Sequence, residues 1–242
     1  MIDVVNLTKV YGKLRAVDSL SFRVAPGEIV GLIGPNGAGK STTLRCIVGL
    51  QAPTAGSVTV AGHDMFRDPV PAKRQLAFMA DEPQLFEYLT VMEHLRLTAR
   101  IFGVADFERR AAALLEELEL DDKRTSLPGE LSRGMKQKVA IACGLIHEPN
   151  VMLFDEPLTG LDPLGIRQMK ETIVARGRAG AAIVVSSHLL HLVEEICTRV
   201  AIIDRGVKVA DGTLEELSAR SDLVEAGSSL EQIFLKVTER DD

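Results

Sequence analysis

A glycine-rich segment, set between an apolar run and a helix-like segment, carries the clearest chemical signal in the chain. Residues 34–41 satisfy the pattern G-x-x-x-x-G-K-[ST]. Glycines let backbone N–H groups approach a phosphate closely, and the N-terminus of a following helix favours an anion. We expect Lys40 to reach the β- and γ-phosphates and the Ser41 hydroxyl to ligate Mg²⁺. A nucleoside triphosphate site is therefore predicted at Gly34, Pro35, Asn36, Gly37, Ala38, Gly39, Lys40 and Ser41.

Two acidic residues follow a second apolar run, residues 151–154. The run leads directly into Asp155 and Glu156. If this strand is parallel to the one before the glycine-rich loop, both carboxyl ends lie at the same edge of the sheet. There Asp155 can hold the shell of Mg²⁺, and Glu156 can polarise the attacking water. Two acids after a strand often mark only the start of a helix, so the prediction of Mg²⁺-dependent hydrolysis depends on the loop and the acids together.

The elements that must position these groups are predicted from apolar periodicity. Strand patterns cover residues 20–24, 28–33, 57–60, 76–79, 151–154, 182–185 and 200–203. Helical spacing is found over residues 41–50, within 91–120, and at 166–174 and 189–196. Because strands and helices alternate after residue 150, the fold class is predicted as α/β, with a parallel sheet covered by helices. A mostly helical insertion is expected near residues 88–148.

Composition limits the class of protein. The 242 residues carry 28 basic and 34 acidic side chains, a formal charge of −6, and 46% of them are hydrophobic. No apolar stretch approaches the roughly 18–20 residues of a membrane-spanning helix, and the N-terminal residues lack the basic lead of a signal peptide. Three scattered cysteines predict reduced packing residues in a cytosolic protein. The acidic balance and the absence of tryptophan argue against a nucleic-acid partner.

The order of motifs along the chain resembles that of the ATP-binding cassette (ABC) ATPases. Residues 131–135 read Leu-Ser-Arg-Gly-Met and resemble the LSGGQ signature, with its helix after it. Asp155-Glu156-Pro157 follows at the family's spacing, and residues 159–163 resemble the D-loop, which contains Asp162. His188 stands where the family keeps its switch histidine, and Tyr11 matches the aromatic residue that stacks on adenine. The resemblance covers nearly the whole chain.

The resemblance implies a fold and a domain division. The expected fold is an α/β P-loop NTPase, with a RecA-like core that has a parallel sheet plus an antiparallel β part, and an inserted helical subdomain. One ABC ATPase domain is expected over residues 1–217, with the core at 1–87 and 149–217 and the helical subdomain at about 88–148. A short C-terminal extension, 218–242, would follow.

The resemblance also implies that ATP and Mg²⁺ are the cofactors and that two chains form a head-to-tail dimer. Each ATP would lie between residues 34–42 of one chain, Thr42 included, and Ser132, Arg133 and Gly134 of the other. The helix that starts near Arg133 would direct its positive N-terminus at the γ-phosphate across the interface. The second chain is expected to be another copy or a related ATPase subunit.

Further roles follow from the same resemblance. Glu156 and His188 are implied as the catalytic residues, with His188 sensing the γ-phosphate and holding the attacking water with Glu156. Ser41 and Asp155 are implied as metal-side residues. The D-loop, with Asp162, would pass information between the two sites of the dimer.

Three positions depart from the family pattern. Met135 replaces the usual glutamine of the signature. Arg133 replaces a glycine of the signature, and it either leans into solvent or adds positive charge near the phosphate bound by the other chain. Asp81 occupies the place of the Q-loop glutamine. A carboxylate can still offer oxygen to Mg²⁺ or its water, so Asp81 is predicted as a metal-side residue. The alternatives are that Asp81 only caps a turn, or that Gln84 serves in its place.

Two classes of function remain open. The favoured class is the ATPase subunit of a membrane transporter, peripheral on the cytoplasmic face of the membrane, which docks on a separate transmembrane permease through residues 81–90 and the helical insertion. The alternative is a soluble ABC ATPase acting on ribosomes or DNA; those classes carry two cassettes or a long coiled-coil insertion, and neither pattern is found here. Residues 229–238 and 87–95 resemble segments of multidrug, sodium or antibiotic-efflux ATPases, so export is expected.

Overall fold

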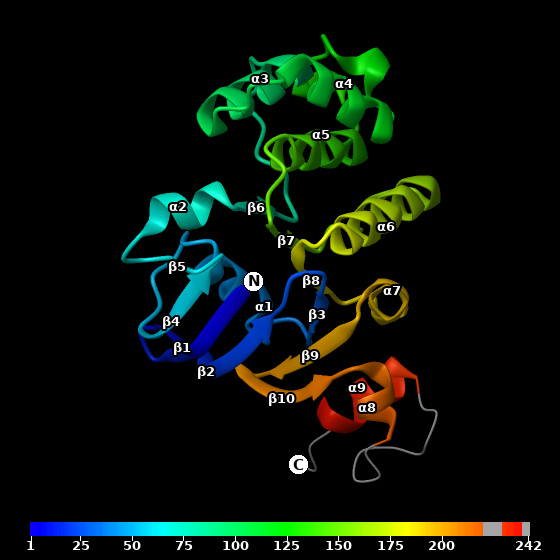
Figure 1. Cartoon of the computed structure of the whole chain (residues 1–242). Coiled ribbons are helices and arrows are strands. Elements are labelled where there is room, and N and C mark those ends of the chain that lie inside the picture. The colour runs from blue at the N-terminus through cyan, green and yellow to red at the C-terminus, as the bar shows by residue number, and fades with distance from the viewer. Residues whose placement is uncertain (220–228, 239–242) are drawn as a thin grey trace.

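The computed structural model describes residues 1–219 and 229–238, whose strands form two β-sheets (Figure 1). Six strands make the larger sheet in the order β10-β9-β3-β8-β7-β6, all parallel except β10, which pairs antiparallel with β9. Their bounds are Ile29–Ile33 (β3), Leu76–Met79 (β6), Val151–Asp155 (β7), Ala182–Ser187 (β8), Arg199–Asp204 (β9) and Val207–Gly212 (β10). The predicted α/β fold with a parallel sheet is confirmed. The strands that precede the glycine-rich loop and the two acids end at the same edge of this sheet.

The smaller sheet is antiparallel and has the order β2-β1-β4-β5. Its strands are Ile2–Tyr11 (β1), Leu14–Val24 (β2), Ala55–Val60 (β4) and His63–Asp64 (β5). Side chains such as Ile2, Val4 and Leu7 on β1 are buried in one cluster with apolar residues of the larger sheet. This is the antiparallel β part that the resemblance implies.

Helices cover both faces of the larger sheet, because alternate residues of its central strands point to opposite sides. Leu153 and Val184 join the cluster that contains α1 (Lys40–Ile47), whereas Phe154 and Val185 join the cluster of α6 (Pro163–Arg178) and α7 (Leu190–Ile196). A short helix, α2 (Pro69–Arg74), precedes β6, and α8 (Leu214–Ser218) and α9 (Leu230–Thr238) pack against β10. The larger sheet therefore lies between two packed layers.

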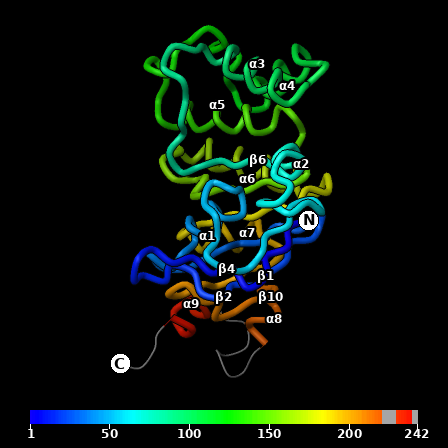
Figure 2. Tube along the Cα trace, turned by 90° about the vertical axis from the view of Figure 1, so that its left-hand side faces the viewer, coloured from blue at the N-terminus to red at the C-terminus, as the bar shows by residue number. Residues whose placement is uncertain are grey.

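Three helices form a separate group at the end of the molecule opposite β10 and α9 (Figures 1 and 2). They are α3 (Val91–Phe102), α4 (Phe107–Glu117) and α5 (Arg133–Leu145), with short 3₁₀ turns at Asp121–Lys123 and Pro128–Glu130. A capping box fixes the start of α3, because the Thr90 hydroxyl accepts from the Glu93 N–H and the Glu93 carboxylate accepts from the Thr90 N–H. The helical insertion is therefore present, whereas the exact division at residues 88 and 148 stays a prediction.

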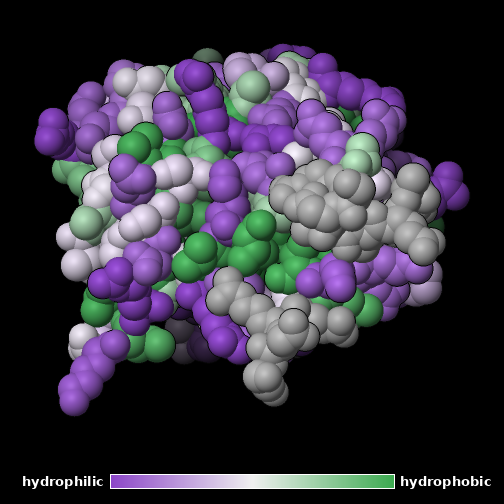
Figure 3. All heavy atoms as spheres, turned by 90° about the horizontal axis from the view of Figure 1, so that it is seen from below, coloured by the Kyte–Doolittle hydropathy of each residue, from purple (hydrophilic) through white to green (hydrophobic). Residues whose placement is uncertain are grey.

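The opposite end carries the last described helix. Leu230 and Ile233 of α9 are buried against β10 and α7, while Leu235 is exposed. Figure 3, which views the molecule from this end, shows hydrophobic side chains in the middle of an otherwise mostly hydrophilic face. The predicted extension 218–242 falls partly outside the described residues, at 220–228 and 239–242. Within the described part of the chain, no helix combines the length and the apolar character needed to cross a membrane.

Candidate active site

The glycine-rich loop connects the fully buried strand β3 to α1 and lies tightly against two neighbouring strands. A Cβ on Gly34 would lie 2.2 Å from the Ile203 carbonyl oxygen of β9. Gly39, the N-cap of α1, has φ of 105°, and a Cβ there would lie 2.5 Å from the Ala16 carbonyl oxygen. Only glycine fits these two positions. The loop thus leads into α1 with backbone N–H groups free of side-chain obstruction, as a phosphate cradle requires.

Lys40 is the first residue of α1 and is almost buried, with 7% of its surface exposed. Its ammonium donates to the carbonyl oxygens of Gly34 at 2.7 Å and Pro35 at 3.2 Å. Burial lowers the pKa of Lys40, and the nearby charges of Glu156 and Asp155 raise it in part. The amine is thus held on the loop, within electrostatic range of both acids.

Asp155 ends β7 and is 5% exposed. Its Oδ1 accepts from the Ser41 hydroxyl at 3.2 Å and from the Ser186 hydroxyl at 2.5 Å. The parallel pairing of β3, β8 and β7 brings these three residues together, as the strand pattern predicts for Ser41 and Asp155. A hydroxyl and a carboxylate oxygen side by side are ligands that Mg²⁺ prefers, so this pair fits the ion that the resemblance implies. Ser186 completes the cluster and was missed in the sequence.

Glu156 directs its side chain toward the end of the neighbouring strand β8. Its Oε2 lies 2.8 Å from His188 Nδ1 and accepts from the His188 N–H at 3.4 Å. The backbone at Glu156 has φ of 51°, in the left-handed region, and its N–H donates to the Ser186 carbonyl oxygen at 3.1 Å. Strain of this kind persists where the surroundings fix the residue. A carboxylate oriented by an imidazole can accept a proton from a water molecule.

Ser132 caps α5: its hydroxyl accepts from the Met135 N–H at 3.2 Å, so the helix begins at Arg133 as expected. Asp162 caps α6 in the same way, by accepting from the Gly165 N–H at 2.7 Å. The two segments touch within one chain, because a Cβ on Gly134 would lie 3.4 Å from Leu161. The signature and D-loop residues therefore form a second group, beside the cluster of Lys40, Ser41, Asp155, Glu156 and His188.

Two of the three residues that depart from the family pattern, Arg133 and Asp81, face each other. Arg133 Nη2 lies 3.5 Å from Asp81 Oδ1, with 57% and 45% of the two side chains exposed. Arg133 is thus partly exposed, as one interpretation has it, and it has an acidic partner in its own chain. Asp81 follows β6, so it lies at the carboxyl edge of the sheet, one strand from Asp155.

Tyr11 lies at the end of β1 with 42% of its surface exposed. Its hydroxyl donates to the Gln51 side-chain oxygen, and the Lys9 ammonium lies 5.1 Å from the ring centroid. Stacking of this ring on adenine stays a prediction.

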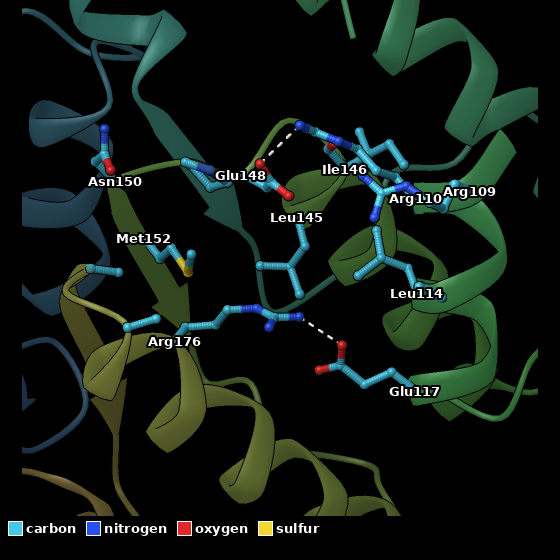
Figure 4. A pocket seen from close by; sticks show the side chains of 14 residues that line it. Arg109, Arg110, Leu114, Glu117, Leu145, Ile146, Glu148, Asn150, Met152 and Arg176 are labelled. Atoms are coloured by element: carbon cyan, nitrogen blue, oxygen red, sulfur yellow. Dashed lines mark hydrogen bonds and ion pairs between the residues drawn. The ribbon is translucent and has the colours of Figure 1, made fainter. Parts of the chain in front are cut away.

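A cavity of about 460 Å³ lies where the helical group meets the core (Figure 4). Two ion pairs stand on opposite sides of it: Arg110 to Glu148 at 2.9 Å, and Arg176 of α6 to Glu117 of α4 at 2.7 Å. Thr172 also donates to the Glu117 carboxylate, at 3.1 Å. The two Glu117 contacts attach α4 to α6, the helix that continues from the D-loop segment.

A second hollow, of about 430 Å³, is a mainly apolar groove between β6, the loop after it, α3 and α5. Phe86 and Leu97 line it and are exposed, and Tyr88, 88% exposed, follows in the same loop. His94 ties this loop to α3, because the Phe86 N–H donates to His94 Nε2 at 2.9 Å and His94 Nδ1 lies 2.8 Å from the Thr90 carbonyl oxygen. The wall of the groove that carries the exposed Phe86 is therefore attached to α3.

Comparisons with known proteins identify close relatives. The family model described as ABC transporter matches residues 17–159. The ABC-type transporter ATP-binding protein EcsA of Bacillus subtilis is 38% identical over 100% of this chain and 98% of its own length. The Nod factor export ATP-binding protein I of Paraburkholderia xenovorans is 37% identical over 95% of this chain and 75% of its own.

Solved structures match the fold closely. One described as an ATP-binding subunit of an ABC transporter superposes with a TM-score of 0.94 at 37% identity, covering 99% of this chain and 100% of that one. A dimeric post-hydrolysis structure of the ATP-binding cassette MJ0796, bound to ADP and Pi, gives 0.81 at 27% identity and covers 88% and 99%.

Proposed function

This chain belongs to the ABC transporter family as an ATP-binding and ATP-hydrolysing subunit, and we propose that it drives the export of a substrate through a separate transmembrane permease. In this proposal it binds the cytoplasmic face of the membrane through the permease. The division into a core, 1–87 and 149–217, a helical subdomain, 88–148, and an extension, 218–242, belongs to the same proposal.

We assign the hydrolytic roles from the cluster at the sheet edge. The glycine-rich loop and Lys40 bind the phosphates, and Ser41 with Asp155 holds Mg²⁺, which when bound neutralises phosphate charge. Glu156 accepts the proton of the attacking water, and His188 orients the Glu156 carboxylate through the 2.8 Å contact. Hydrogen bonds from the Ser41 and Ser186 hydroxyl groups to Asp155 Oδ1 fix the orientation of the Asp155 carboxylate beside Ser41.

A second copy of the chain completes the site in this proposal. The MJ0796 cassette forms a dimer in its ADP- and Pi-bound structure, which supports a homodimer here. Head-to-tail association lets the N-terminus of α5, with Ser132, Arg133 and Gly134, approach the nucleotide of the other subunit. The capped start of α5 supports this role, because a helix N-terminus stabilises phosphate charge.

The groove beside residues 83–86 is the observation that carries the permease proposal. Its apolar lining and the exposed Phe86 and Tyr88 are costly to leave in water and suit a partner with apolar side chains. The groove lies between the loop that follows β6 and the helical group, so a partner seated there contacts both. Closure of the ATP-bound dimer can then move that partner.

Export is supported by two features. The relative from Paraburkholderia is named for Nod factor export. The second feature is the segment 229–238, which resembles the tail of efflux ATPases. It lies on α9, where Leu230 and Ile233 pack against the core, so these residues also stabilise the domain.

Site-specific crosslinking tests the permease proposal. A photoreactive amino acid at Tyr88, in the full chain expressed in its native cells, is expected to crosslink to a polytopic membrane protein. The control is the same probe at Leu235, exposed on α9 at the opposite end of the molecule. Crosslinks from Tyr88 only to ribosomal or DNA-bound proteins, or equal membrane crosslinks from both positions, would contradict the proposal.

A further inference from the structure

Arg133 and Asp81, two of the residues that depart from the family pattern, are neighbours in space although 52 positions separate them. Arg133 opens α5, and Asp81 lies two residues beyond the end of β6. The 3.5 Å contact between Arg133 Nη2 and Asp81 Oδ1 joins the helical group to the segment that leaves the larger sheet. Nothing in the hydrolytic roles proposed above uses this contact.

The contact belongs to a longer seam along one face of α5. Gln137, one helical turn after Arg133 and 3% exposed, donates from Nε2 to the Ala80 carbonyl oxygen at 3.3 Å. Two turns further, Gly144 lies so close to Met79 that a Cβ would stand 2.8 Å from its sulfur. Residues 79, 80 and 81 therefore each contact the same face of α5, at Gly144, Gln137 and Arg133 respectively.

The turn before α6 also lies close to the Arg133 side chain. A Cβ on Gly160 would lie 3.1 Å from Arg133 Nε and 3.2 Å from its Cδ. Gly160 has φ of 77°, a conformation that favours glycine. The arginine side chain thus lies close to both the D-loop segment and Asp81, and the absence of a side chain at residue 160 leaves room for it.

Electrostatics favour the pairing. A cation at the first position of a helix stands at the positive end of the helix dipole, which is unfavourable in isolation. The negative charge of the Asp81 carboxylate partly offsets the positive charge of Arg133. Because both side chains are about half exposed, the pair is worth no more than about a fivefold change in an equilibrium constant, and salt weakens it.

We propose that Arg133 is a positioning residue that, through Asp81 and Gly160, holds the N-terminus of α5 in a defined orientation before a second subunit binds. The consequence of this positioning rests on the proposed function: the start of α5, with Ser132 and Gly134, has its final orientation before it meets the other subunit. Asp81 and Arg133 then act as one compensating pair of charges.

Charge exchange tests the pair directly in nucleotide-free protein. Arg133→Asp and Asp81→Arg each place like charges together, and the double variant restores opposite charges. Hydrogen–deuterium exchange in peptides covering residues 131–140 is expected to rise about threefold to fivefold in Asp81→Arg. The rise is smaller in Arg133→Asp, because an anion suits the N-terminus of α5, and exchange returns toward wild type in the double variant. Exchange in the double variant as fast as in the single ones would overturn the proposal.

A matched control separates this pair from ion pairs in general. Arg96 and Glu108 form an exposed pair at the same 3.5 Å distance, between α3 and α4. Arg96→Glu is expected to leave exchange in residues 131–140 unchanged. If single charge reversals unfold the domain, Arg133→Gln and Asp81→Asn serve instead; Arg133→Lys is expected to stay within about twofold of wild type, and loss of protection there would overturn the role of the charge.

Kinetics keep the two proposals distinguishable. Arg133→Gln is expected to lower kcat severalfold while the affinity of the monomer for ATP stays at the wild-type value, because the glycine-rich loop is untouched. An unchanged kcat would contradict the positioning role. A wild-type protein without ATPase activity would contradict the proposed function, and the exchange experiment would still test the pair.

Discussion

At the residue scale, the candidate active site is a set of polar side chains at the ends of two strands and the start of one helix. Ser41, Asp155 and Ser186 share hydrogen bonds, and Glu156 faces His188 across the same edge. Asp155 and Glu156 are adjacent yet differ in surroundings: Asp155 accepts from the hydroxyl groups of Ser41 and Ser186, whereas Glu156 lies against the His188 imidazole. Adjacent carboxylates can therefore take different roles.

Replacement of Glu156 by glutamine tests the assignment of the catalytic base. The amide keeps the size of the side chain but cannot accept the proton of water, so turnover is expected to fall by about 100-fold or more. ATP binding is expected to remain, since Lys40 and Ser41 are unchanged. Steady-state ATPase assays and calorimetric ATP titration measure the two quantities. A variant with wild-type turnover would show that another group is the base.

The contact between Ser41 and Asp155 could be predicted from the sequence, because the carboxyl ends of parallel strands meet. Ser186 follows an apolar run just as Asp155 does, so the same signal was present for it. The Asp81–Arg133 contact could not be predicted. It depends on how the helical group sits on the sheet, and no local pattern encodes that placement.

At the scale of elements, long apolar strands and amphipathic helices were found where the periodicity placed them, including β6, β7, β8 and α6. Two strands were not predicted among the described residues, the short β5 and β10, Val207–Gly212, which lacks a long apolar run. Ion pairs of Asp211 with Arg199 and Lys208, at 2.5 and 2.6 Å, help to hold it at the edge of the sheet. The Arg199–Asp211 pair joins β9 to β10 and so depends on the fold, whereas the Lys208–Asp211 pair lies within β10.

The packing of α3 on the end of α5 is expected to depend on pH. The His147 ring stacks on Phe102 with 3.7 Å between centroids, and burial lowers the pKa of His147. The unfolded chain therefore binds more protons than the folded one below the ordinary histidine pKa, so the free energy of unfolding falls as the pH drops from about 7 to 5.

Urea unfolding of wild type and His147→Gln across that range measures the effect. The stability difference between them is expected to shrink toward low pH, because the variant lacks the titrating group. Curves that stay parallel would show that His147 does not contribute to the pH dependence.

At the scale of the whole molecule, the helical group is attached to the core at several places. Glu117 is bound by Arg176 and Thr172 of α6, and the seam of α5 follows residues 79–81. The apolar groove lies on the same boundary. The groove therefore lies against α5, the helix that begins at the signature segment.

ATP-driven association of two chains is the central claim, and analytical ultracentrifugation of Glu156→Gln tests it most directly. The variant is expected to sediment as a monomer without nucleotide and as a dimer with Mg²⁺ and ATP, because bound ATP is held between the subunits and is not hydrolysed. Lys40→Ala, with its phosphate contact removed, is expected to stay monomeric under both conditions. A Glu156→Gln chain that binds ATP and remains a monomer would contradict the account.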